Sequence, residues 1–178
     1  MAAFQNLTAI ARPAAVALES FRDKKGAILN DSNLSADGKK SHLDGAAESV
    51  RRALNETAPL LDKARREAAR KREAFSRPGF EAANVEQAIL HSEIRQHLKS
   101  AKPADRTALL DGADANTLSA VLLAPCWLSG ISSDLHDSLR LQYARLVHPD
   151  DYAALVEQEA AIAAITAHLS AIAEELPV

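Results

Sequence analysis

The sequence predicts an all-α fold, with long coiled-coil-like helices at both ends of the chain around a small bundle of short helices. Of the 178 residues, 37 are alanine and only seven are aromatic (four Phe, two Tyr, one Trp). Alanine is the strongest helix former but buries little surface, so we expect long, thin helix packing rather than a deep core. Two stretches repeat apolar residues in steps of three and four, and no alternating run predicts a strand.

The first expected element is a helix over about residues 13–30. Pro13 suits the first turn of a helix, where its missing N–H would have no partner, and apolar residues follow it at helical spacing. The turn-forming residues 30–33 come next, and Ser35 is placed to cap the following helix.

The clearest helical pattern lies between residues 43 and 75. Its positions alternate in steps of four and three, which is typical of a coiled-coil seam. Pro59 removes one backbone hydrogen bond and predicts a kink or a break near 55–58; the seam keeps its phase across the proline, which favours the kink. The seam positions are Leu43, Ala47, Val50, Leu54, Thr57, Leu61, Ala64, Ala68, Lys71 and Phe75.

The Pro-Gly pair at 78–79 predicts a boundary at 76–80, because it ends a helix and opens a turn. We therefore expect an N-terminal helical hairpin with a long heptad helix over residues 1–77. Residues 78–178 would form a short-helix bundle followed by a long C-terminal helix. The short helices are expected at about 84–101, 103–113, 115–124 and 133–147, and the long one at about 150–175.

Local signals fix several ends of these helices. Asn84 and Gln87 are spaced like a capping box, and Ser132 or Ser133 can cap the helix at 133–147. Trp127, at a helix end, is expected to anchor the core of the bundle. The last helix carries a second seam, formed by Leu155, Gln158, Ile162, Ile165, Leu169, Ile172 and Leu176.

Charge is unevenly placed along the chain. Residues 1–100 carry 17 Lys and Arg against 13 Asp and Glu, whereas residues 101–178 carry 4 against 11. This asymmetry favours contact with a partner, or with another copy in a head-to-tail sense. The alternative is a solvated helix face with pairs such as Glu67–Lys71.

The sequence indicates a reducing compartment and no membrane. Cys126 is the single cysteine, so an internal disulfide is excluded. The first residues lack a basic leader before an apolar run, and we expect no secretion signal. No stretch approaches the about 18 apolar residues that a membrane span requires.

We expect no catalytic, cofactor or metal site, and therefore no enzyme. His91-Ser-Glu93 with Pro125-Cys126 resembles the zinc deaminase motif, but the second thiolate position holds Ser129. Residues 31–35 resemble the start of a calcium loop, yet the glycine and glutamate positions that such a loop needs are not filled.

Two further motifs point to partners. His148-Pro149-Asp150 resembles the tripeptide of J-domain cochaperones, which would make the chain a cytosolic helical adaptor or cochaperone-like protein. The usual basic helix before that tripeptide is absent, and a helix terminus explains the same residues. A basic stripe could contact nucleic acid phosphates, although acidic residues interrupt it and no aromatic residue accompanies it. The stripe comprises Arg65, Arg66, Arg70, Lys71 and Arg72.

The long seams indicate contact with other protein subunits. The helix over 43–75 is longer than the first helix, so we expect part of its apolar stripe to be covered by another copy or another protein. The same residues could instead form intramolecular core. The expected contact residues are Leu43, Val50, Leu54, Leu61, Phe75, Leu155, Ile162, Ile165, Leu169 and Ile172.

Residues 28–43, with Leu-Ser-x-x-Gly-Lys in a turn between helices, and residues 93–162 resemble small helical proteins among phage and prophage virion components. The resemblance implies a non-enzymatic structural protein that is head-associated, portal-adjacent or scaffold-like. It also implies a homo-oligomer or larger assembly, located in the virion and assembled in the host cytoplasm.

Overall fold

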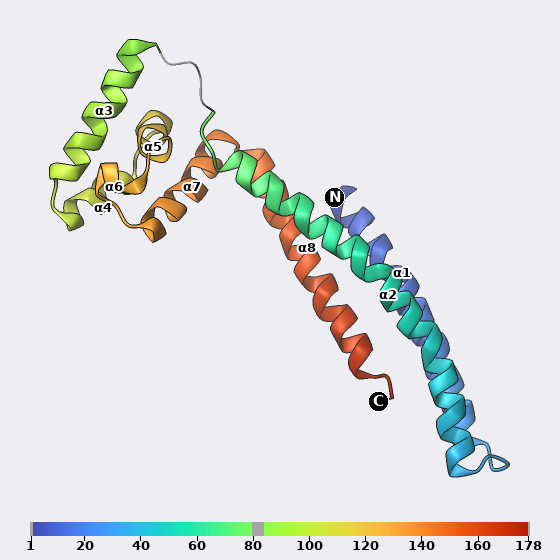
Figure 1. Ribbon diagram of the computed structural model, residues 1–178. Coiled ribbons are helices and arrows are strands. Elements are labelled where there is room, and N and C mark those ends of the chain that lie inside the picture. Colours follow the sequence, from blue (N-terminus) through green and yellow to red (C-terminus); the bar gives the residue numbers. More distant parts are fainter. Residues whose placement is uncertain (1, 80–83, 178) are drawn as a thin grey trace. The chain divides into compact units, whose positions relative to one another are not determined.

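The computed structural model is all-α, as the sequence predicts (Figure 1). It describes residues 2–79 and 84–177, and over these ranges it contains eight helices and no strand. The chain forms two compact units: unit 1 comprises residues 1–68 and 156–178, and unit 2 comprises residues 69–155. This division differs from the expected boundary at 77/78, because most of the last helix packs in unit 1 with the first two helices.

Unit 1 is built from α1 (Ala2–Asn30), the greater part of α2 (Ala36–Phe75) and most of α8 (Pro149–Glu174). The expected start of the first helix at residue 13 is wrong, since Pro13 lies inside α1. A proline in a helix interior loses the bond to the carbonyl four residues earlier. Packing supports the helix around Pro13, because Ala11 and Ala14 are buried. The Thr57 hydroxyl, which bonds the Ala53 carbonyl at 2.7 Å, also lies 3.4 Å from the Ile10 carbonyl.

The connection between α1 and α2 follows the expected turn chemistry. The Asp31 carboxylate accepts from the Asn33 N–H at 2.8 Å, and the Ser35 hydroxyl accepts from the Gly38 N–H at 3.1 Å. The second bond caps α2. This helix continues through Pro59 without a break.

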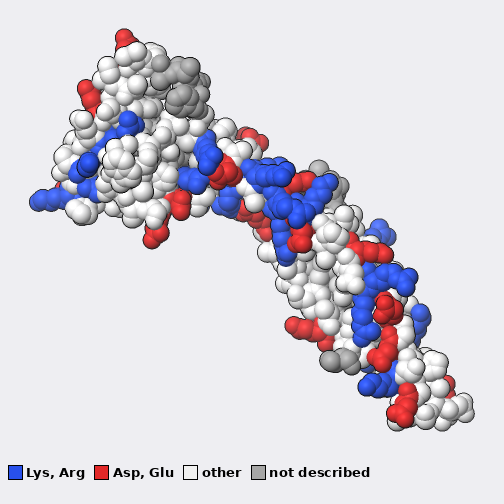
Figure 2. Space-filling model, in the orientation of Figure 1, with Lys and Arg blue, Asp and Glu red and all other residues white. Residues whose placement is uncertain are grey.

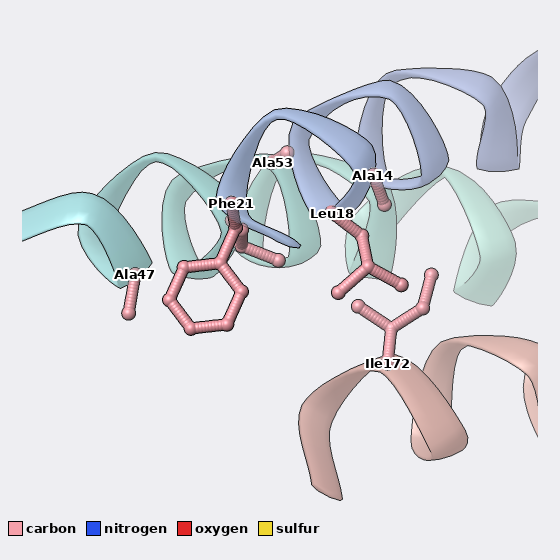
Figure 3. Packing of buried hydrophobic residues seen from close by; sticks show 7 residues of the cluster. Ala14, Leu18, Phe21, Ala47, Ala53 and Ile172 are labelled. Carbon is pink, nitrogen blue, oxygen red and sulfur yellow. The ribbon is translucent and has the colours of Figure 1, made fainter. Parts of the chain in front are cut away.

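The core of unit 1 is thin, as the alanine content predicts. Figure 3 shows Leu18 of α1 and Ile172 of α8 facing each other, with Phe21 between α1 and α2. Phe21 is the one aromatic side chain of this cluster. The buried members are Ala14, Leu18, Phe21, Ala47, Val50, Ala53 and Ile172.

Two arginines hold the C-terminal end of α8 within unit 1. The Arg22 guanidinium pairs with the Glu175 carboxylate at 2.5 Å, and Arg51 donates to the Pro177 carbonyl at 2.7 Å. Arg22 comes from α1 and Arg51 from α2, so both neighbouring helices fix this end.

Unit 2 contains the expected short helices and one that the sequence did not predict, the four-residue α6. Its helices are α3 (Val85–Ser100), α4 (Pro103–Asp111), α5 (Ala115–Leu122), α6 (Cys126–Ser129) and α7 (Ser133–Val147). Asn84 caps α3, and Ser132 rather than Ser133 caps α7.

The core of unit 2 is built from larger side chains than that of unit 1. The expectation that Trp127 anchors this core is wrong, since its side chain is 64% exposed. Cys126 is half-buried and packs against the core. The buried members are Leu98, Leu110, Leu118, Val121, Ile131, Leu139 and Tyr143.

Arg106 ties the end of α3 to the turn after α6. Its guanidinium donates to the carbonyls of Leu98 at 2.8 Å, Ala101 at 2.9 Å and Lys99 at 3.3 Å, and also to the carbonyl of Gly130. Gly130 ends α6 in the left-handed conformation, with φ of 66°, which glycine adopts at little cost.

None of the helices, over the residues that the structure describes, is long and apolar enough to cross a membrane.

Candidate interaction surface

The residues expected to contact partners lie in the chain's own packing. Six are buried, namely Val50, Leu61, Leu155, Ile162, Ile165 and Ile172. The remaining four, Leu43, Leu54, Phe75 and Leu169, are partly buried. The burial of these positions favours the intramolecular core that the sequence left open over coverage of part of the stripe by another chain. In unit 1, a first helix of 29 residues and the last helix cover the stripe of α2.

The histidines of the two motifs considered for zinc binding and for a cochaperone role, His91 and His148, contact other residues of unit 2. His91 Nε2 lies 3.1 Å from Asn116 Oδ1, within unit 2. His148 follows the end of α7, and its ring centroid lies 5.5 Å from that of Phe75. α8 begins at the next residue, so the His-Pro-Asp tripeptide lies at a helix junction rather than on a loop. Among the described residues, no three His, Cys, Asp or Glu side chains gather as a metal site would require.

The basic stripe of α2 is a surface of mixed charge. Arg65 pairs with Asp62 at 3.0 Å and donates to the Thr166 hydroxyl at 2.7 Å. Lys63 lies 4.0 Å from Glu67. Figure 2 shows acidic residues beside the basic ones along this helix. These pairs agree with the solvated face that the sequence left open as the alternative.

Trp127 is 64% exposed. Among the described residues of unit 2, no other large apolar residue outside the start of α3 is as exposed. Trp127 stands on α6, and Leu123, which is 39% exposed, precedes it by four residues. Residues 115–133 contain no Asp, Glu, Lys, Arg or His. Pro125 starts α6 and Gly130 ends it, and the Gly130 N–H donates to the Trp127 carbonyl at 3.3 Å. The tryptophan is thus held in a short, fixed turn.

Cations surround this uncharged segment. Arg95 donates to the Ala120 carbonyl at 2.8 Å, which places it beside α5, three residues before Leu123. The bonds of Arg106 to the backbone carbonyls of Lys99 and Gly130 bring the backbone at the end of α3 close to the turn after α6. Figure 2 shows basic residues over the end of α3 and the start of α4, with uncharged atoms beside them over α6. We use the name tryptophan patch for Leu123 and Trp127 of this uncharged segment together with Arg95, Lys99 and Lys102 on the neighbouring α3 and the turn into α4.

A second exposed surface lies on the N-terminal half of α3. Val85 is 74% exposed and Ile89 is 54% exposed, and Glu86 and Glu93 are exposed beside them. At 100° per residue, these four side chains fall within an arc of about 100°. Figure 2 shows acidic residues over this half of the helix. We call this surface the α3 face.

Shifted pKa values occur at helix ends, away from both surfaces. The Arg22 guanidinium, hydrogen-bonded to Glu175, lowers the pKa of that carboxyl, and the same pair raises the pKa of Arg22. The backbone N–H of Thr117 lowers the pKa of Asp114, which caps α5 and accepts that bond at 2.8 Å. Each shift stabilises a helix end.

Neither surface was predicted from the sequence, because contacts were expected in the periodic seams. One signal in the sequence could have found the tryptophan patch: residues 115–133 form an uncharged run of 19 residues that carries the single tryptophan.

We found no match for this chain among known protein families, curated proteins or solved structures. The geometry of the chain's own surfaces is therefore the basis for inferring its function.

Proposed function

We propose that the chain is a non-enzymatic structural protein that assembles with other protein subunits. The resemblance to phage and prophage proteins makes a virion component, head-associated, portal-adjacent or scaffold-like, the specific form of this proposal. The observation that carries the proposal is the exposure of Trp127, a residue that is 64% exposed on a folded, uncharged turn.

An exposed tryptophan with a basic rim has the composition of a protein-binding centre. Tryptophan and arginine are enriched among the residues that dominate binding energy, and polar residues surround such centres. Leaving a ring of this size in water costs hydrophobic free energy that a partner would recover. The tryptophan patch has both components, with Arg95 on its rim.

The seams no longer support this proposal, since their side chains form intramolecular core. The adaptor or cochaperone interpretation loses support as well, because His148 is partly buried and lies against the Phe75 ring. Such a tripeptide would have to be presented on an accessible loop to reach a partner.

Particle purification tests the proposal. Particles from the producing host would be separated on a density gradient, and the chain quantified against a known shell protein by mass spectrometry. We expect the chain to sediment with the particles at a fixed copy number. The Trp127→Ser variant should stay in the unassembled fraction, whereas the control Val16→Ser, at an exposed position of α1, should assemble normally. A wild-type chain found only in the unassembled fraction would overturn the proposal.

A further inference from the structure

We infer that the tryptophan patch binds the α3 face of a second copy of this chain. The inference rests on the proposed function and names the partner at that same surface. Both surfaces belong to unit 2, so one compact unit supplies the whole interface.

The two surfaces are complementary in charge and alike in apolar content. The tryptophan patch offers Leu123 and Trp127 with three cations, and the α3 face offers Val85 and Ile89 with two carboxylates. Opposite charges around apolar centres guide association and fix its register. Against a neutral partner, neither set of charges would be matched.

On α3, the charges of each set are separated by about whole helical turns. Glu86 and Glu93 are two turns apart, about 10.5 Å along the axis, and Ile89 lies between them. Arg95 and Lys99 are one turn apart, about 6 Å, and Lys102 follows at the start of α4. Each surface therefore has an apolar centre and charges on its rim, which is the usual anatomy of an interface.

One molecule cannot satisfy both surfaces by itself. Arg95 lies about 180° from Glu86 and about 160° from Glu93 around α3. Its guanidinium bonds to Ala120 on the α5 side of the helix. Lys99 lies about 120° from Glu93 and about 140° from Glu86, so neither cation of α3 projects in the direction of the two carboxylates.

This arrangement gives a head-to-tail interface. Each copy offers its α3 face to one neighbour and its tryptophan patch to another, and such unlike contacts close into rings or continue as filaments. Both products are typical of subunits in a particle, which links the inference to the proposed function.

Complementation between two variants tests the inference. Ile89→Arg should prevent binding at the α3 face and leave the tryptophan patch unchanged. Leu123→Glu should prevent binding at the tryptophan patch and leave the α3 face unchanged. Sedimentation velocity should show that the wild type associates as its concentration rises, and that each variant alone is a monomer. An equal mixture should form a heterodimer and stop there, because only one pair of intact surfaces remains.

The single tryptophan reports on the contact directly. In the mixture, the emission of Trp127 from the Ile89→Arg copy should shift to the blue and become resistant to acrylamide quenching. The other copy can be made with Trp127→Phe so that only one ring emits. Melting curves from circular dichroism would verify that the exposed substitutions leave the fold intact.

Charge reversal distinguishes a specific pairing of the two surfaces from a non-specific loss of self-association. Glu93→Lys alone and Lys99→Glu alone should each weaken self-association at least about tenfold. The double variant should regain association, since every copy then presents both reversed charges. Lys40→Glu, at an exposed position in unit 1, is the matched control and should change little.

Three results would overturn the inference. A wild type that stays monomeric at every concentration would exclude self-association, while the particle experiment would still decide the proposed function. Variants that dimerise regardless of Ile89 and Leu123 would place the contact elsewhere. Protection of Trp127 by vesicles containing anionic phosphatidylglycerol, without self-association, would assign the patch to a lipid surface.

Discussion

Unit 1 and unit 2 bury their apolar side chains in different ways. Unit 1 packs three long helices through a core in which three of seven members are alanine, and its periodic stripes are covered by the chain itself. Unit 2 packs short helices around leucine, isoleucine, valine and tyrosine, and leaves Trp127 exposed. A regular apolar repeat therefore reports that a face is buried, but not which chain buries it. In this protein the candidate contact surface lies in the unit without long repeats.

The strongest test of this comparison removes the Phe21 ring from the described core cluster of unit 1. Phe21→Ala should lower the free energy of unfolding by about 3–5 kcal/mol, because the cavity cannot be filled by neighbouring alanines. Hydrogen exchange should show faster exchange in α1 and its neighbours in unit 1, with α3 to α7 little affected. Val16→Ala, at a position 56% exposed, should change little. Equal loss of protection in both units would contradict the division.

A second test targets Arg106, which ties the end of α3 to the turn after α6 in unit 2. Arg106→Met should lower the free energy of unfolding by about 2–4 kcal/mol, since four carbonyls lose their donor. Thermal melting followed by circular dichroism measures the change. Lys99→Met, which keeps the backbone carbonyl of that residue, is the control. A loss no larger than the control's would show that water replaces the guanidinium.

Substitution of Gly130 should give a smaller effect in the same place. Gly130→Ala should cost about 1–2 kcal/mol, because its φ of 66° disfavours a side chain and the new Cβ would lie 3.1 Å from Arg106 Nη1. Urea titration would measure this cost. Gly112→Ala is the matched control, since its φ is −112° and nothing lies within 4 Å of the place that the new methyl group would take.

The smallest expected effect is the part of the pH dependence of stability that the Arg22–Glu175 pair contributes in unit 1. Arg22 lowers the pKa of Glu175 below its ordinary value of 4.5, so the unfolded chain takes up this proton more readily. The stabilisation is present above that ordinary value and is lost as the pH falls through the lower pKa of the folded state. Glu175→Gln should remove this part of the acid dependence, measured as the difference in urea midpoint between pH 6 and about pH 3. Glu174→Gln should leave it in place.

Local signals predicted the helix ends well. Ser35 and Asn84 are caps whose side chains bond backbone groups two or three residues away, so the sequence around them is sufficient. Pro13 misled for the same reason: a proline fits the first turn, and only the packing against α2 shows that the helix continues upstream.

The candidate surface depended on tertiary structure. Whether Leu61 faces a partner or its own chain is decided by where α1 and α8 lie, which the repeat does not encode. Trp127 sits on a helix of four residues, too short for any periodic signal, and aromatic side chains are usually buried. Its exposure could be found only from the folded bundle.

The bonds that Arg22 of α1 and Arg51 of α2 make to the residues after α8 have a consequence for proteolysis. Helix ends fray more readily than helix centres, and peptidases cut the chain where it opens. Here Arg22 holds Glu175 and Arg51 holds the carbonyl of Pro177, each from a different helix. An endopeptidase acting on residues 174–177 would need both attachments to open, so cleavage there should be slow while unit 1 stays folded.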